Sequence, residues 1–240
     1  MSKPIIDQIS LFLPAYNEEG VIKDTIAKSD AILKKLAKKY EILVIEDGSK
    51  DKTATIVKGL MKQYKNLRMF QHKPNRGYGG ALKSGFKETR YDPIVFIDSD
   101  GQFDLSELTS LVAKMNQTKS DLVIGYRIKR NDPPFRLLLA NLLKLWNLFW
   151  FGMYVKDVDC AFKLIRRRVI DGIPPLISNG GIISTEFMAR VQKAGFKVSQ
   201  VGVHHYPRTT GESTGDKGSV IKKAVFESLK LWYQLNFPQA

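Results

Sequence analysis

Pro93-Ile-Val-Phe-Ile-Asp98-Ser-Asp-Gly-Gln102 carries the sharpest signal in the chain. A short, β-rich apolar run, predicted as a strand over Ile94–Ile97, ends directly at two aspartates. In open α/β sheets ligands bind beyond the carboxyl ends of the strands, so acidic residues at such an end are candidate ligand contacts. If the segment stays extended, Asp98, Asp100 and Gln102 point to one side and can offer oxygens to Mg²⁺ or Mn²⁺. The alternative is an ordinary turn that leads into the next helix.

Outward from this stretch, short apolar runs alternate with longer amphipathic ones. This alternation is typical of a parallel sheet with crossover helices. Further strands are predicted at Ile9–Leu13, Glu41–Ile45, Leu67–Gln71, Asp121–Gly125, Cys160–Ile165 and Lys197–Val203. Helices are predicted at Glu19–Lys38, Lys52–Tyr64, Gly79–Glu88, Leu105–Met115, Pro133–Tyr154, Ile182–Ala194 and Ser219–Phe237. The order predicts an α/β fold with a mostly parallel central sheet and helices on both faces.

The size and charge of the chain limit what it can be. Its 240 residues suit one domain, which we expect over 1–215, with a helical appendage over 216–240. Lys and Arg number 38 against 24 Asp and Glu, a net charge of +14, which favours a polyanionic partner such as a membrane or a phosphorylated ligand. Nucleic acid is not expected, because no recognition motif accompanies the charge. The single Cys160 fits a reducing compartment, and no signal peptide or spanning helix is expected.

Three more polar motifs follow or precede predicted elements. Glu46-Asp47-Gly48-Ser49 could bind a nucleobase or ribose, or could be a turn that caps a helix. In Pro14-Ala-Tyr-Asn-Glu-Glu19, Tyr16 could flank a base, and Asn17 could equally cap the next helix. In Asn75-Arg-Gly-Tyr-Gly-Gly80 the glycines could admit a phosphate near Arg76 and Lys83, or could serve a loop that needs positive φ.

Taken in order, the motifs at 14–18, 46–49, 75–77 and 98–100 resemble the family 2 glycosyltransferases, which have the GT-A nucleotide-diphospho-sugar transferase fold. Gly125-Tyr-Arg127, the segment 157–163 and Arg208-x-x-Gly-Glu-Ser213 are similar to polyprenyl-phosphate glycosyltransferases such as dolichol-phosphate mannosyltransferase. The resemblance covers essentially the whole chain. The chain departs from the family's usual Ser-Gly-Phe, which is Cys160-Ala-Phe162 here.

The resemblance implies a role for most of these side chains. Asp98, Asp100 and Gln102 would hold Mg²⁺ or Mn²⁺ and the diphosphate of a GDP- or UDP-hexose (mannose or glucose). The nucleotide-sugar site would comprise Pro14, Tyr16, Glu18, Asp47, Arg76, Lys83, Asp98, Ser99, Asp100 and Arg208. Arg127 and Arg136 would bind the phosphate of a polyprenyl (dolichyl or undecaprenyl) acceptor and would act in catalysis with Asp98 and Asp100.

The acceptor determines the mechanism. A lipid phosphate is already anionic, so the resemblance predicts in-line attack with inversion and no side-chain base. A hydroxyl acceptor on a cell-surface glycan or glycolipid is the alternative; it would need a general base, for which Glu186 is the candidate against a structural role on its helix. A non-catalytic nucleotide-binding or nucleic-acid-binding protein is a remote further alternative.

Two apolar helices favour a membrane surface. The stretch 133–155 is rich in leucine and aromatic residues but is interrupted by Asn141, Lys144 and Asn147, so we expect it to lie in the membrane interface; a buried core helix is the alternative. The closing helix repeats an apolar stripe beside lysines, which suits anionic lipid. The expected location is peripheral, at the cytoplasmic face of the membrane, with a separate membrane-anchor subunit as a further conceivable partner.

Overall fold

The computed structural model describes residues 5–128, 134–208 and 218–237, without the side chains of 134–140 and 218–225. Seven strands form one sheet in the order β3-β2-β1-β4-β6-β5-β7. The strands are β1 (Ile6–Ala15), β2 (Ala37–Glu46), β3 (Leu67–Gln71), β4 (Ile94–Phe96), β5 (Leu122–Arg127), β6 (Lys163–Ile165) and β7 (Val198–Val203). The α-helices are α1 (Ile22–Leu36), α2 (Thr53–Leu60), α3 (Gly77–Glu88), α4 (Leu108–Thr118), α5 (Pro134–Phe151), α6 (Arg167–Gly172), α7 (Ile183–Lys193) and α8 (Gly218–Asn236), and a 3₁₀ turn, η1 (Leu105–Glu107), precedes α4.

The sheet is mostly parallel, which confirms the predicted fold class. β1 runs parallel to β2 and β4, β2 to β3, and β5 to β7. β6 is antiparallel to both of its neighbours, β4 and β5. The ends of β1, β2, β4 and β5 therefore lie at one edge of the sheet, and β6 begins at that same edge.

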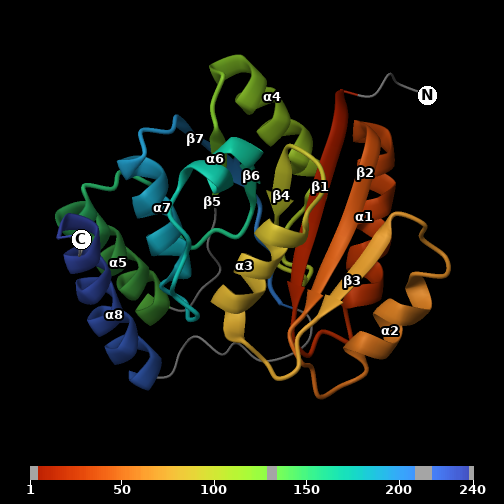
Figure 1. The fold of residues 1–240 in the computed structure, drawn as a ribbon, viewed down its shortest axis with the longest axis horizontal. Helices are drawn as coiled ribbons and strands as arrows, with labels where there is room; N and C mark the ends of the chain where they lie inside the picture. The colour runs from red at the N-terminus through yellow and green to blue at the C-terminus, as the bar shows by residue number, and fades with distance from the viewer. Residues whose placement is uncertain (1–4, 129–133, 209–217, 238–240) are drawn as a thin grey trace.

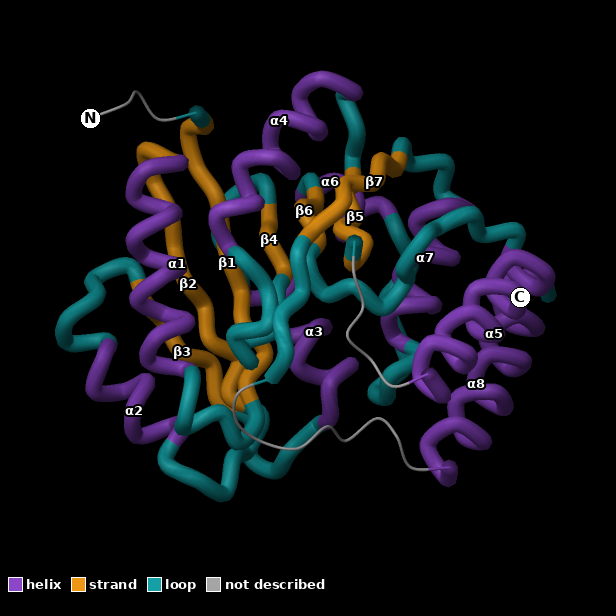
Figure 2. The backbone as a smooth tube through the Cα atoms, turned by 180° about the vertical axis from the view of Figure 1, so that it is seen from behind, coloured by secondary structure: helices purple, strands orange, loops and turns teal. Residues whose placement is uncertain are grey.

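Helices cover both faces of the sheet and enclose two apolar cores (Figures 1 and 2). Apolar residues of α1, α2 and α4 pack on one face, and those of α3, α6 and α7 pack on the other. β1 and β2 are buried on both sides over most of their length, the pattern of central parallel strands. This double-sided burial makes the sheet a rigid platform for the loops at its carboxyl edge.

The structure moves two of the predicted boundaries for tertiary reasons and adds one short helix. α1 ends at Leu36 rather than Lys38, because Ala37 and the lysines after it join β2 and pair with β1. The strand predicted at Cys160–Ile165 is only β6, Lys163–Ile165, since Cys160, Ala161 and Phe162 follow a turn at 158–159 and are not paired in a strand. The six-residue α6 was not predicted at all; it is too short for a clear helical periodicity.

α5 and α8 lie side by side at the end of the molecule opposite α2 (Figures 1 and 2). The indole nitrogen of Trp146 donates to Ser228 Oγ at 2.9 Å, and the rings of Trp150 and Trp232 meet at 5.2 Å. No helix within the described residues is long and apolar enough to cross a bilayer.

Candidate active site

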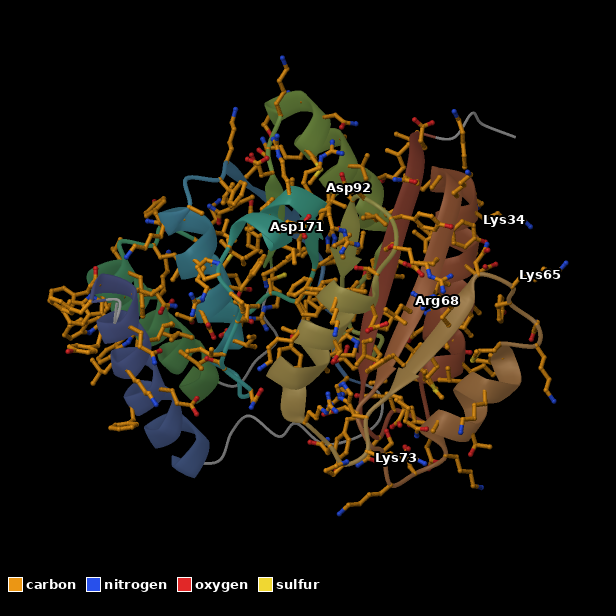
Figure 3. The ribbon with its side chains drawn as sticks, viewed as in Figure 1. Lys34, Lys65, Arg68, Lys73, Asp92 and Asp171 are labelled. Carbon is orange, nitrogen blue, oxygen red and sulfur yellow. The ribbon has the colours of Figure 1, made fainter. Side chains whose placement is uncertain are left out.

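The candidate site lies at the edge of the sheet where β1, β2 and β4 end. Residues 16–19 follow β1, 47–51 follow β2 and 97–102 follow β4. In Figure 3, Lys73 lies at the bottom of the view, near this edge of the sheet, and Asp92, which precedes β4, lies in the upper half. The parallel order of the three strands therefore gathers loops that are far apart in the sequence.

Asp98 and Asp100 form an acidic pair after β4. Burial raises the pKa of Asp98 to about 7, and the charge of Asp100 adds to the effect. The Tyr78 hydroxyl donates to Asp98 Oδ1 at 3.2 Å. The Ser99 hydroxyl donates to the Pro14 carbonyl at 2.7 Å, so the loop is tied to the end of β1. Ser99 and Pro14, both expected near the nucleotide, thus fix the position of the acidic pair.

The segment that carries this pair is bent, and the expectation of an extended segment is wrong. Gly101 has a positive φ of 74°, and the backbone N–H of Gln102 donates to Asp100 Oδ1 at 3.1 Å. The Gln102 side-chain amide donates to the Tyr206 carbonyl at 2.8 Å. Gln102 is therefore bonded to the chain that follows β7, and the two aspartates are brought together by a turn rather than by strand alternation.

Arg208 reaches the acidic pair from the segment after β7. Its Nη2 lies 2.6 Å from Glu18 Oε1 and 3.7 Å from Asp100 Oδ2. Burial raises the pKa of Glu18 to about 7 against the opposing charge of Arg208. Residues 209–217, expected to close over the donor, lie outside the described part of the chain. Glu18 and Arg208 thus join the site although they are separated by most of the sequence.

The loops after β1 and β2 are bonded to each other. Asn17, which has a positive φ of 57°, accepts from the Lys50 N–H at 2.8 Å instead of capping α1. Glu19 Oε2 accepts from the Lys52 N–H at 2.9 Å. Tyr16, next to these bonds, keeps 39% of its surface exposed, so its ring is accessible to a ligand.

A histidine that the sequence analysis did not single out supports Asp47. The His72 ring is 1% exposed, with Nδ1 2.6 Å from Asp47 Oδ1 and Nε2 2.8 Å from Ser84 Oγ. Asp47 Oδ1 also accepts from the Arg76 N–H at 2.9 Å. His72 directly follows β3, so its position at the end of a predicted strand was the signal that could have identified it.

The glycine-rich motif opens α3 and packs against a distant loop. Gly77 has a positive φ of 76°, and a Cβ at Gly79 would lie within 2.8 Å of Asn179. Lys83 Nζ donates to Asn179 Oδ1 at 2.6 Å. Arg76, Lys83 and Asn179 line a pocket of 420 Å³ beside the Asp47 loop. The glycines therefore serve loop geometry and close packing, while Arg76 and Lys83 remain at the rim of a polar pocket.

The chemistry of Asp98 and Asp100 suits a divalent cation. Mg²⁺ binds through one or two carboxylates and completes its shell with water and substrate phosphates, so two aspartates suffice. The raised pKa of Asp98 reflects burial beside a second carboxylate, an arrangement that a cation stabilises. No cluster of three or more His, Cys, Asp or Glu suited to a metal occurs within the described residues. The pair fits an ion that is shared with a diphosphate.

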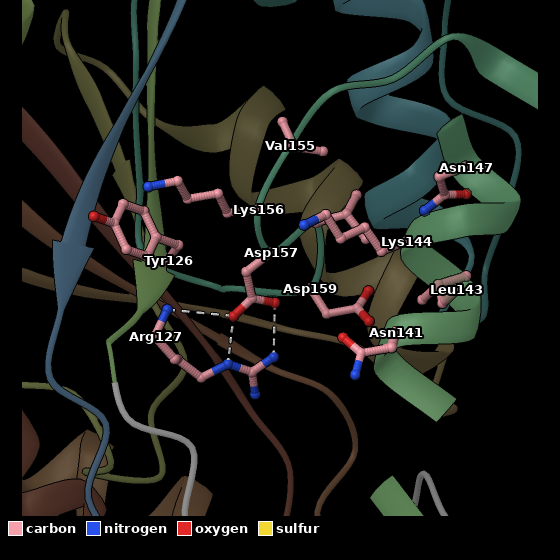
Figure 4. A pocket seen from close by; sticks show the side chains of 11 residues that line it. Tyr126, Arg127, Asn141, Leu143, Lys144, Asn147, Val155, Lys156, Asp157 and Asp159 are labelled. Carbon is pink, nitrogen blue, oxygen red and sulfur yellow. Dashed lines mark hydrogen bonds and ion pairs between the residues drawn. The ribbon is translucent and has the colours of Figure 1, made fainter. Parts of the chain in front are cut away.

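Arg127 lies at the end of β5, two strands from the acidic pair. Its Nε and Nη2 donate to both oxygens of Asp157 at 2.7 and 2.8 Å (Figure 4). Burial lowers the pKa of Arg127, but the bonds and charge of Asp157 outweigh it and hold the pKa above its usual value. The side chain of Arg136 in α5 lies outside the described residues.

Beside Arg127 is a pocket of 150 Å³ between α5 and the segment after it (Figure 4). Asn141, Lys144 and Asn147 face it from α5, and Lys156 faces it from the other side. The predicted polar stripe of this helix therefore turns toward Arg127. Asn147 is 2% exposed, and its Oδ1 has no hydrogen-bond partner within the described residues.

Glu186, the candidate general base, is fully buried in α7. Its carboxylate accepts from the N–H groups of Ile177 and Ser178 at 3.0 and 2.8 Å and from Arg190 Nε at 2.8 Å. Burial raises the pKa of Glu186, but these hydrogen bonds outweigh it and keep the pKa below its usual value. These hydrogen bonds give Glu186 a structural role: it holds the loop 177–179, which carries Asn179.

The fold and the family comparison define a glycosyltransferase of the GT-A fold. Residues 10–173 match the family model described as Glycosyl transferase family 2, and the chain belongs to this family. The chain is 30% identical over 226 residues to a dolichyl-phosphate beta-glucosyltransferase of Dictyostelium discoideum, with 85% of this chain and 68% of that protein covered.

Two further relatives have similar names. Glycosyltransferase AglD of Haloferax volcanii is 28% identical over 240 residues, 95% of this chain but only 37% of that protein. An undecaprenyl-phosphate 4-deoxy-4-formamido-L-arabinose transferase of Shewanella sediminis is 28% identical, with 87% of this chain and 62% of that protein covered. The chain thus spans only part of these longer relatives.

A solved structure supports the fold independently. Glucosyl-3-phosphoglycerate synthase from Mycobacterium tuberculosis, solved with Mn²⁺ and UDP-glucose, superposes with a TM-score of 0.71. It is 19% identical, and the match covers 98% of this chain and 81% of that one. At this identity the match shows the GT-A fold alone.

Proposed function

We propose that this glycosyltransferase moves a hexose from a GDP- or UDP-sugar to a polyprenyl phosphate, with inversion at the anomeric carbon. The observation that carries the proposal is the pairing, at one edge of the sheet, of the Asp98–Asp100 acidic pair with the pocket beside Arg127, whose lining has three cations, Arg127, Lys144 and Lys156, against Asp157 and Asp159. The first suits a cation and a diphosphate, and the second suits an acceptor that is itself an anion.

On the donor side, the nucleotide contacts the loops after β1 and β2, where Tyr16 and Asp47 lie. Asp98 and Asp100 would hold Mg²⁺ or Mn²⁺, which when bound takes up negative charge on the leaving nucleoside diphosphate. Arg208, now bonded to Glu18, is within reach of the same diphosphate. The solved relative that binds Mn²⁺ with UDP-glucose supports this assignment.

On the acceptor side, the phosphate of the lipid lies in the pocket beside Arg127, with Lys144 and Lys156 at its walls. Arg136 is proposed to contribute from the same helix. A phosphate monoester is a ready nucleophile near neutral pH, so these cations need only orient it for in-line attack. The engaged state of Glu186 supports a reaction without that residue as a base. The names of the dolichyl- and undecaprenyl-phosphate relatives point to the same acceptor class.

A lipid acceptor requires contact with a membrane, for which the α5–α8 surface is the candidate. We define this surface by its exposed apolar residues: Leu142, Leu145, Leu148, Phe149, Phe226, Leu229, Tyr233 and Phe237. Exposed apolar patches of this kind mark protein or membrane contacts, and the net charge of +14 favours anionic lipid. We therefore propose a catalytic unit over 1–215 that docks at the cytoplasmic face through helix 133–155 and the appendage 216–240, with or without a separate anchor subunit.

The test is transfer of labelled sugar from a panel of GDP- and UDP-hexoses to undecaprenyl or dolichyl phosphate in detergent, with Mn²⁺, Mg²⁺ or EDTA. We expect metal-dependent label in the lipid fraction that disappears in Asp100→Asn. Asp171→Asn on α6, whose side chain is exposed and which lies outside the candidate site, is the matched control and should retain full activity. Label that appears on a hydroxyl acceptor, with none on lipid phosphate, would contradict the acceptor assignment.

A further inference from the structure

Lys163 is a buried amine that the proposed reaction leaves without a role. It is 1% exposed and is the first residue of β6, opposite Phe96 of β4 and Ile124 of β5. Because β6 runs against its neighbours, its first residue lies at the edge where β4 and β5 end. Lys163 therefore sits between the acidic pair that follows β4 and Arg127 at the end of β5.

The ammonium of Lys163 organises the turn before β6. Nζ donates to the carbonyl oxygens of Val158, at 3.2 Å, and of Cys160, and it lies 5.5 Å from the centre of the Phe96 ring. The same turn carries Asp157, which orients Arg127 through two bonds. Loss of the ammonium would leave two carbonyls of this turn without their buried donor, so the position of Asp157 depends on Lys163.

The charge of Lys163 interacts with carboxylates of both half-sites, where the donor half-site is the loop with Asp98 and Asp100 and the acceptor half-site is Arg127 with the 157–160 turn. Burial lowers the pKa of Lys163, and the charges of Asp157, Asp159 and Asp98 oppose that effect. In turn, the charge of Lys163 favours the ionised form of Asp98. A buried ammonium is costly to desolvate and is retained only where it is bonded and paired. An apolar side chain of similar length would fill this space without that cost, so the charge itself calls for an explanation.

We infer that Lys163 is a positioning residue that fixes the donor half-site and the acceptor half-site relative to each other. It bonds the 157–160 turn on the side of Arg127, and on the other side it is paired with Phe96 of β4, two residues before Asp98. It touches neither substrate, and the inference rests on the proposed function. Removal of the ammonium should therefore reduce turnover even when both substrates are saturating, because the donor and acceptor half-sites no longer keep their relative position.

The experiment compares Lys163→Met with Arg167→Met as the matched control. Arg167 also donates to buried backbone carbonyls, those of Phe86 and Thr89, but at the start of α6 away from the site. Urea unfolding measures what each substitution costs in stability. At a temperature where both variants are folded, we expect at least a tenfold lower kcat and a higher acceptor KM for Lys163→Met, and a kcat within twofold of wild type for Arg167→Met. If Lys163→Met does not fold, Lys163→Gln is measured against the same criteria.

The outcomes separate the inference from the proposed function. If the wild type labels no lipid, the proposed function fails, and Mn²⁺-dependent UDP binding becomes the readout for Lys163. The same measurement is made with GDP, and a change of at least fivefold for the Lys163 variant in the affinity for the nucleotide that the wild type binds, with none for Arg167→Met, supports the inference. If the wild type is active and the Lys163 variant keeps its kcat within twofold, Lys163 is merely structural and the inference is overturned. Equal losses of kcat in Lys163→Met and Arg167→Met overturn it as well.

Discussion

Glu186→Gln tests whether the acceptor needs a side-chain base. In the wild type, the buried carboxylate receives three donors, the N–H groups of Ile177 and Ser178 and the Nε of Arg190. Glutamine keeps the shape but replaces one oxygen with an amide NH₂, which must face a donor. Arg190, only 10% exposed, also loses its charged partner. Breaking a buried ion pair from one side costs about 3–5 kcal/mol.

That loss is large but measurable, since domains of this size have unfolding free energies of about 5–15 kcal/mol. Urea denaturation at low temperature should show a lower midpoint with an unchanged slope. Arg190→Gln should cost a similar amount, because it breaks the same pair from the other side. Below the unfolded pKa of 4.5, the difference between wild type and Glu186→Gln should shrink, because a depressed folded pKa adds stability only above that pH and loses it as the pH falls.

Activity per folded molecule should change far less than stability. We expect the kcat of Glu186→Gln to fall by less than about tenfold, whereas removal of a general base typically costs about 10²–10⁴-fold. The assay is transfer to polyprenyl phosphate under conditions where circular dichroism shows both proteins to be folded. A loss of 100-fold or more in kcat with unchanged stability, well within that general-base range, would refute the reasoning and make Glu186 a base for a hydroxyl acceptor.

Three further outcomes test the site and the α5–α8 surface. Mn²⁺ affinity measured by calorimetry should rise about tenfold per pH unit up to pH 7 and then level off. The reason is that Asp98, with a pKa of about 7, must lose its proton to bind a cation. An affinity independent of pH would count against Asp98 as a ligand. Arg127→Gln should raise the acceptor KM by at least about tenfold with unchanged UDP binding, because a charge-assisted hydrogen bond contributes about 1.5–3 kcal/mol. An unchanged acceptor KM would remove Arg127 from the acceptor site. Phe149 and Phe226 are 80% and 72% exposed. The double variant Phe149→Ser and Phe226→Ser should lose binding to anionic vesicles in sedimentation, while UDP binding in solution persists. Undiminished vesicle binding would place the membrane contact elsewhere.

The site was predictable where chemistry follows a strand directly. Asp98, Asp100, Asp47 and Glu18 all come directly or almost directly after buried apolar runs, so the sequence placed them at the ligand edge. The extended geometry that we expected for 98–102 was wrong, because Gly101 bends the segment and Ser99 ties it to β1. A glycine indicates that a turn is possible but does not indicate where the turn leads.

Residues that act through distant partners could not be predicted from local patterns. His72 supports Asp47 from another strand end, and Arg208, which follows β7, reaches Glu18, which follows β1 four positions away in the sheet. Lys163 was part of a recognised motif, but its burial between two half-sites follows from the reversed direction of β6. Each of these contacts joins residues that only the strand order brings together.

The sequence by itself determined the α/β class, the alternation of strands and helices, the acidic pair and the apolar character of α5, because these depend on local periodicity and composition. Only the tertiary structure decided that β6 runs antiparallel, that the Glu186 carboxylate accepts from three donors, and that the polar stripe of α5 faces Arg127. The physical reason is that burial, ion pairing and hydrogen bonding of a side chain depend on neighbours that lie far away in the chain.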